Sequence, residues 1–156
     1  MAELQTSYSE TVPAGFPGMV ANGETSNRIT RTIEDAGGIG FGVPAARGTL
    51  DHGCTATVAA AADVLGITIA TTALGLTAGA TADTYAEHDN VAIMTGGAIY
   101  VDVVGAVAPG DPLTFGIGAG AADGIGNTAA DATHIALTGW VADETVTDGV
   151  CRIVKR

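Results

Sequence analysis

The sequence predicts an all-β fold, a sandwich or a barrel, and three observations support this. Val, Ile and Thr, which favour strands, supply 46 of the 156 residues, whereas Leu, Glu, Lys, Gln, Arg and Met, which favour helices or tolerate them well, supply 23. Apolar residues alternate with small or polar ones in several short runs, which is the period of a strand. Turn-forming residues recur at intervals of about ten residues, as in sandwiches and barrels.

The apolar runs give the expected order of strands. They lie at 28–34, 39–43, 64–70, 91–95, 98–104, 113–115, 133–142 and 150–156. Gly96 and Gly97 separate two runs and predict a tight hairpin. Turn residues at 109–112 predict another corner, and a turn around Asp148 joins the last two strands as a hairpin. Only residues 57–65 have the composition of a short helix.

Two segments are poor in regular structure. Residues 1–24 are predicted to form an extended N-terminal arm, because their prolines and glycines oppose a helix and leave Phe16 and Met19 as apolar pegs. Residues 25–156 are then a single β domain, long enough to bury a core. Within it, residues 116–131 are almost entirely Gly, Ala, Asp and Asn, which predicts a mobile loop.

The charge is acidic and argues against nucleic acid as a direct partner. There are 17 acidic residues against 6 basic ones, with no Lys or Arg between Arg47 and Arg152. The start, MAELQTSYSE, is polar, and no apolar stretch approaches the roughly 18 to 20 residues of a membrane span. We therefore expect a soluble protein, made in the cytoplasm, with no membrane partner.

No catalytic, cofactor-binding or metal site is predicted, so we expect a protein that is not an enzyme. Cys54 and Cys151 are far apart in sequence, and a reducing cytoplasm favours buried free thiols. His52 and Cys54 have a spacing that a metal site on a strand permits, but the three histidines are isolated from one another, and a lone histidine is more often structural. The glycine patterns GGIGFG and GIGAGAADGIG lack the following helix that dinucleotide binding requires.

One segment is less generic. PAGFPGMVANGE, residues 13–24, resembles the opening of the structural cement proteins, or head decoration proteins, of tailed bacteriophages. The resemblance continues in order through GIGFGVPA, RGTLDHGC, LGITIA, DNVAIMTGGAIYVDVVGAVAPGDPLTF and THIALTGWVADE, and so covers nearly the whole chain. The alanine run and the Gly-Ala loop near residue 120 depart from it.

The resemblance implies a jelly-roll-like or tulip-like β domain that forms a homotrimer on the outer surface of the capsid, over threefold or quasi-threefold axes. Its partner would be the major capsid protein, and its role would be to hold neighbouring capsomers together. Extended arms suit such bridging, because they gain main-chain hydrogen bonds or insert apolar pegs into grooves. The residues expected to contact the partner are Pro13, Phe16, Pro17, Met19, Arg28 and Arg31. For the two arginines, a solvated strand edge is an equally good interpretation.

Two other functions stay open at this point. One is another β subunit of the virion, associated with the tail tube or a fibre. The other is a β-barrel module that binds a small molecule or a glycan, which is disfavoured because only one Trp, three Tyr and three Phe are available to line a pocket. The single tryptophan, Trp140, fits core burial better than a subunit contact.

Overall fold

The computed structural model describes residues 15–21, 25–71 and 83–156, and the all-β prediction is confirmed. The strands are β1 (Asn27–Ile33), β2 (Ile39–Gly40), β3 (Pro44–Arg47), β4 (Gly53–Thr55), β5 (Val64–Thr68), β6 (Thr84–Tyr85), β7 (Asn90–Val107), β8 (Pro112–Gly116), β9 (Ile125–Gly126), β10 (His134–Ala142) and β11 (Val146–Lys155). The short 3-10 helices are η1 (Ala61–Asp63) and η3 (Gly118–Asp123).

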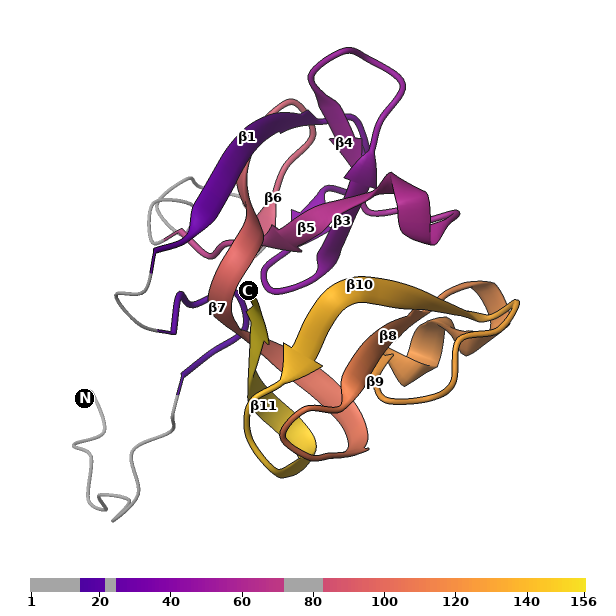
Figure 1. Ribbon diagram of the computed structural model, residues 1–156. Coiled ribbons are helices and arrows are strands. Elements are labelled where there is room, and N and C mark those ends of the chain that lie inside the picture. Colours follow the sequence, from indigo (N-terminus) through magenta and orange to yellow (C-terminus); the bar gives the residue numbers. More distant parts are fainter. Residues whose placement is uncertain (1–14, 22–24, 72–82) are drawn as a thin grey trace, which may run out of the picture.

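The main sheet closes on itself twice because the long strand β7 is paired along both of its edges. Strands β1, β4, β3, β5 and the first half of β7 form one closed ring, since β1 pairs with both β4 and β7. Strands β11, β10, β8, β9 and the second half of β7 form another. We call these rings the N-terminal barrel and the C-terminal barrel. Figure 1 shows them as two lobes joined by β7.

Strand β7 passes from one barrel to the other at Gly97. Up to Gly96 it pairs with β1, and from Gly97 onwards it pairs with β11. Gly97 has a φ of +125°, which glycine adopts readily and other residues rarely do. The hairpin predicted at this pair of glycines is therefore wrong. The glycines bend one continuous strand instead, because its two halves have different pairing partners.

Residues 15–21, which we call the N-terminal segment, pair with β7 at this junction. The N–H of Gly18 donates to the carbonyl of Tyr100 at 2.8 Å, and the N–H of Tyr100 donates to the carbonyl of Met19 at 2.9 Å. Val20 forms a β-bridge with Ile99. The segment thus occupies the stretch of β7 between the positions that pair with β1 and the position that pairs with β9.

Each barrel has its own apolar core. The core of the N-terminal barrel contains Ile33, Ile39, Ala45, Cys54, Tyr85, Val91 and Ile93. The larger core runs along β7 into the C-terminal barrel and includes Trp140, which is 2% exposed, so its predicted burial is confirmed. Cys54 and Cys151 are both buried and free, as predicted.

The antiparallel pairing of β10 with β11 confirms the C-terminal hairpin. The turn predicted around Asp148 is wrong, because residues 143–145 join the two strands and Asp148 lies within β11, at a register shift of its pairing with β7. The mobile loop predicted for residues 116–131 is wrong, because this stretch contains η3 and β9. Main-chain hydrogen bonds fix it, among them one of 2.8 Å from Gly116 N–H to the carbonyl of Gly124. Of residues 57–65, only Ala61–Asp63 form a helical turn, η1, and Val64 begins β5. The sequence did not predict the second short helix, η3.

The bend in β7 gives a direct test of this architecture. A Cβ at residue 97 would lie 2.8 Å from the Cβ of Ser26, whereas a Cβ at residue 96 would meet nothing nearer than 3.5 Å. We expect Gly97→Ala to lower the free energy of unfolding by about 1 to 3 kcal/mol, through left-handed backbone strain and the clash. Gly96→Ala is the matched control and should change it far less. Urea denaturation measures both, and equal losses would contradict the role of Gly97.

Candidate functional site

The residues predicted to contact a partner fall in two places. Phe16, Pro17 and Met19 lie in the N-terminal segment, while Pro13 lies outside the described residues. Pro17 and Gly18 form the corner of a tight turn, closed by a 3.0 Å hydrogen bond from Met19 N–H to the carbonyl of Phe16. Proline followed by a glycine of positive φ is the usual composition of a type II turn. The turn presents Phe16, which is 49% exposed, on a base that is fixed to β7.

An apolar groove begins beside this turn, between the two barrels. Its volume is about 310 Å³, and its apolar lining consists of Pro17, Phe41, Val43, Val104, Phe115 and Ile125. Val104 is 48% exposed. Asp102, also exposed, brings a carboxylate to the lining. Sequence reasoning missed the groove because its walls come from segments that only the fold brings together.

Arg28 and Arg31 lie on β1 of the N-terminal barrel, apart from Phe16. Arg28 pairs in register with Met94, whereas the N-terminal segment bonds to β7 at Tyr100. These two positions of β7 are six residues apart, which corresponds to about 20 Å along a strand. The guanidinium of Arg28 donates to the hydroxyl of Ser26, and that of Arg31 donates to the carbonyl of Thr30. Within the described ranges, neither forms an ion pair.

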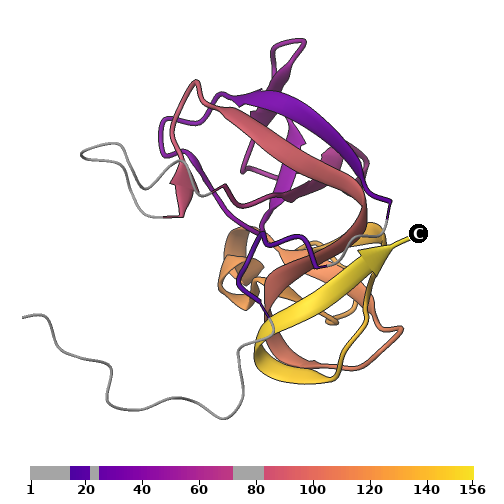
Figure 2. The ribbon, with the colours of Figure 1, turned by 90° about the vertical axis from the view of Figure 1, so that its left-hand side faces the viewer.

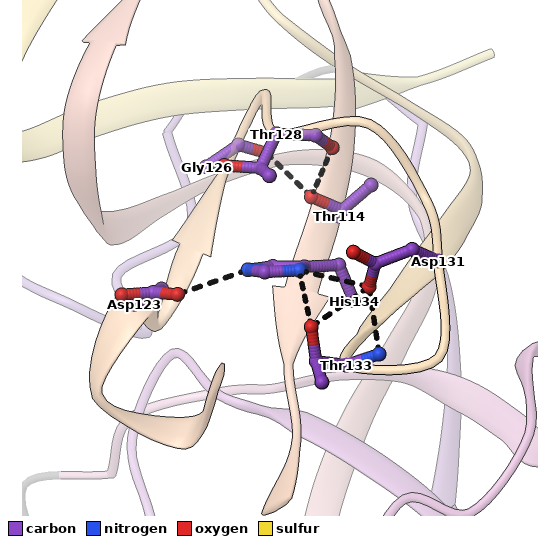
Figure 3. A network of polar contacts seen from close by, with 7 residues as sticks. All are labelled: Thr114, Asp123, Gly126, Thr128, Asp131, Thr133 and His134. Atoms are coloured by element: carbon purple, nitrogen blue, oxygen red, sulfur yellow. Dashed lines mark hydrogen bonds and ion pairs between the residues drawn. The ribbon is translucent and has the colours of Figure 1, made fainter. Parts of the chain in front are cut away.

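A polar cluster that sequence reasoning did not find lies in the C-terminal barrel (Figure 3). His134, the first residue of β10, is only 8% exposed. Its Nε2 lies 3.0 Å from Oδ2 of Asp123, at the end of η3, and its Nδ1 lies 3.1 Å from Oδ1 of Asp131. Thr133 donates to the same Asp131 oxygen from its N–H and its hydroxyl. The cluster therefore ties η3 and the loop before β10 to the barrel.

The geometry of this cluster favours a charged histidine. Ionised carboxylates only accept hydrogen bonds, and each ring nitrogen of His134 lies beside one, so the imidazolium form, in which both nitrogens donate, suits both contacts. The hydrogen bond with Asp131 is the main reason that the pKa of His134 is raised. Hydrogen bonds from Thr133 lower the pKa of Asp131 to about 2. A general base needs an unprotonated ring nitrogen, so this histidine is suited to holding two segments together.

The residues considered for metal or nucleophile chemistry do not form a site. His52 is exposed, whereas Cys54 is fully buried, and burial raises the pKa of its thiol to about 11. Across residues 15–21, 25–71 and 83–156, no three His, Cys, Asp or Glu side chains are grouped to hold a metal ion. In the same ranges, no helix has the length and apolar character needed to span a membrane.

The His134 cluster predicts a pH dependence of stability. Because folding raises the pKa of His134 above its usual value of 6.5, the contribution of the cluster is fully present below that pH and is lost as the pH rises through the folded-state pKa. We expect His134→Gln to be less stable than the wild type at pH 6, with the difference shrinking in alkaline solution. Urea unfolding over a pH series measures this, and NMR titration of the imidazole gives its pKa. A histidine that titrates at or below 6.5 would contradict the proposed charge state.

Comparison with known proteins identifies the family. A family model described as "Structural cement protein (E217 gp24/Pam3 gp6)", a phage cement family, matches residues 4–155. No curated protein matches the chain. A chain in the solved structure described as "The capsid of Myoviridae Phage XM1" is similar with a TM-score of 0.69 at 16% identity, over 99% of this chain and 97% of that chain. An identity this low supports a shared fold only.

The family match covers nearly the whole sequence and confirms the resemblance found in the sequence. It favours a capsid role over the tail-associated and ligand-binding alternatives, and it places the protein in the virion, on the capsid. The chain belongs to the family of phage structural cement proteins.

Proposed function

We propose that this cement protein binds the outer surface of a phage head as a homotrimer and bridges neighbouring copies of the major capsid protein. Membership of the cement family is the observation that carries the proposal. A shell under internal pressure fails where capsomers separate, and a trimer that binds several of them opposes that separation. A net charge of −11 suits a protein that faces away from the packaged DNA.

The N-terminal part of the chain is the proposed bridging element. Residues 15–21 are fastened to β7, and Phe16 is exposed at their turn. The fourteen residues that precede Gly15, among them Pro13, would reach at most about 50 Å if fully extended. Phe16, Pro17 and Met19 then provide apolar contact next to the anchor. Arg28 and Arg31 provide cationic groups for acidic positions on the capsid surface.

We also propose that the role is purely structural, without catalysis. A cement protein acts by binding, and a bound subunit needs no chemical step to hold two capsomers together. The raised pKa values of the Cys54 and Cys151 thiols, caused by their burial, support this because a protonated thiol is a poor nucleophile.

The proposal is tested by light scattering of the purified protein, followed by cosedimentation with empty phage capsids at several salt concentrations. We expect a mass of three chains and a pellet that contains the protein with the capsids. Binding should weaken as salt rises, because salt screens the attraction between the two arginines, Arg28 and Arg31, and acidic positions on the capsid. A monomer that stays in the supernatant would contradict the proposed function.

The position of the N-terminal segment suggests a deletion that tests the role of the arm in capsid binding. We expect deletion of residues 1–14 to leave the barrels folded, because the hydrogen bonds of residues 18–21 to β7 remain. The same deletion should weaken capsid binding by about tenfold or more, since contacts at a few residues dominate most interfaces. Phe16→Asp in the full chain should also weaken it. Circular dichroism checks the fold, and undiminished cosedimentation of both variants would contradict the role of the arm.

A further inference from the structure

Leu50 is the most exposed large hydrophobic residue of the described part of the chain. It is 67% exposed, against 49% for Phe16 and 48% for Val104. It lies in the loop between β3 and β4, residues 48–52, which we call the β3–β4 loop. Figures 1 and 2 show this loop projecting from the N-terminal barrel, away from the C-terminal barrel.

The carboxylate of Glu34 holds the β3–β4 loop in place. It accepts hydrogen bonds from the N–H of Thr49 at 2.9 Å, from the hydroxyl of Thr49 at 2.7 Å and from the N–H of Leu50 at 2.9 Å. These bonds, chiefly that from the Thr49 hydroxyl, lower the pKa of Glu34, so that it is ionised at neutral pH. Polar contacts therefore fix the loop, and burial of Leu50 plays no part in its conformation.

Two glycines make this arrangement possible. A Cβ at residue 48 or residue 53 would collide with the carboxylate of Glu34. The backbone can therefore wrap around the carboxylate only where side chains are missing. A loop fixed in this way loses little further entropy when it binds, which is the condition for an efficient contact.

The β3–β4 loop and the groove between the barrels have complementary chemistry. Leu50 is an exposed apolar side chain, and the exposed Arg47 lies at the base of the same loop. The groove is lined by apolar side chains, and its volume of about 310 Å³ is large enough to hold a leucine side chain. Asp102 adds a carboxylate to the lining. Within the described ranges, neither Arg47 nor Asp102 has a charged side-chain partner. The loop also carries the exposed Asp51, so its charge complementarity to the groove rests on Arg47.

We propose that the β3–β4 loop of one copy docks into the groove of a second copy, with Leu50 in the apolar lining and Arg47 paired with Asp102. The contact joins two different surfaces of the chain, so it is heterologous, and three such contacts close a ring when the rotation between copies is 120°. The inference rests on the proposed function, because it assigns the surfaces that hold the proposed homotrimer together.

The first test removes the apolar contact. Burial of a leucine corresponds to roughly a 10- to 100-fold change in affinity for each contact. We therefore expect Leu50→Asp, and separately Val104→Asp, to raise the trimer dissociation constant by at least tenfold in sedimentation velocity. Ala129→Asp, at an exposed position outside both surfaces, is the matched control and should leave it unchanged. Thermal melting followed by circular dichroism verifies that each variant is folded.

The second test exchanges the charges. Arg47→Asp and Asp102→Arg should each weaken the trimer, and the double variant should recover most of the lost affinity because the ion pair is restored with reversed polarity. Failure of the double variant to recover would overturn the pairing of these two residues. Trimers that persist in every variant would overturn the inference as a whole.

Capsid cosedimentation separates this inference from the proposed function. Wild-type protein that binds capsids but shows no trimer would leave capsid binding standing and overturn the docking of the loop into a second copy. Leu50→Asp that remains trimeric but loses capsid binding would assign the β3–β4 loop to the capsid protein, and would also overturn it. Wild-type protein that neither trimerises nor pellets would contradict the proposed function itself.

Discussion

The pairing of β7 along both edges is the constraint on which the rest of the structure depends. Its first half closes the N-terminal barrel against β1 and β5, and its second half closes the C-terminal barrel against β11 and β9. The bend at Gly97 is the point where β7 changes its pairing partner from β1 to β11. The same strand also anchors residues 18–21, so both barrels and the N-terminal segment share one support.

Hydrogen bonds to ionised side chains hold the chain in place where it has too few large apolar residues to bury much surface. Glu34 organises the β3–β4 loop, and His134, with Asp123 and Asp131, ties down the Gly-Ala-rich stretch before β10. In both places, polar contacts fix the conformation of a segment that consists mainly of small residues. They also leave Leu50 available for contact with another molecule. An acidic, alanine-rich chain can therefore fold compactly and still hold an apolar side chain such as Leu50 in a fixed, exposed position.

Local patterns predicted what local interactions decide. The alternation around Trp140 and in the last residues of the chain identified the C-terminal hairpin, because β10 and β11 are neighbours in the chain and in space. The turn itself was misplaced, since the Asp148–Gly149 pair lies within β11. The composition of the arm pointed to Phe16 as an exposed apolar side chain, since nearby prolines and glycines oppose a regular helix. The turn at Pro17 and Gly18 was not predicted. Gly96 and Gly97 were misread because a hairpin and a bend in one strand have the same local signature. Only the pairing of distant strands distinguishes them.

The features that escaped prediction depend on contacts across the fold. Asp123 and His134 are eleven residues apart, and the walls of the groove come from five separate segments, so no short pattern marks either. The family resemblance supplied the function that residue patterns alone left open, and the family match over residues 4–155 confirmed it.

The central claim is that bound copies of this protein strengthen the shell by holding neighbouring capsomers together. The most direct measurement is the temperature at which DNA-filled heads that lack the protein release their DNA, recorded as purified protein is added. The account predicts that this temperature rises with occupancy and levels off when the binding sites are filled. Heads that bind the protein to saturation yet release their DNA at an unchanged temperature would contradict it.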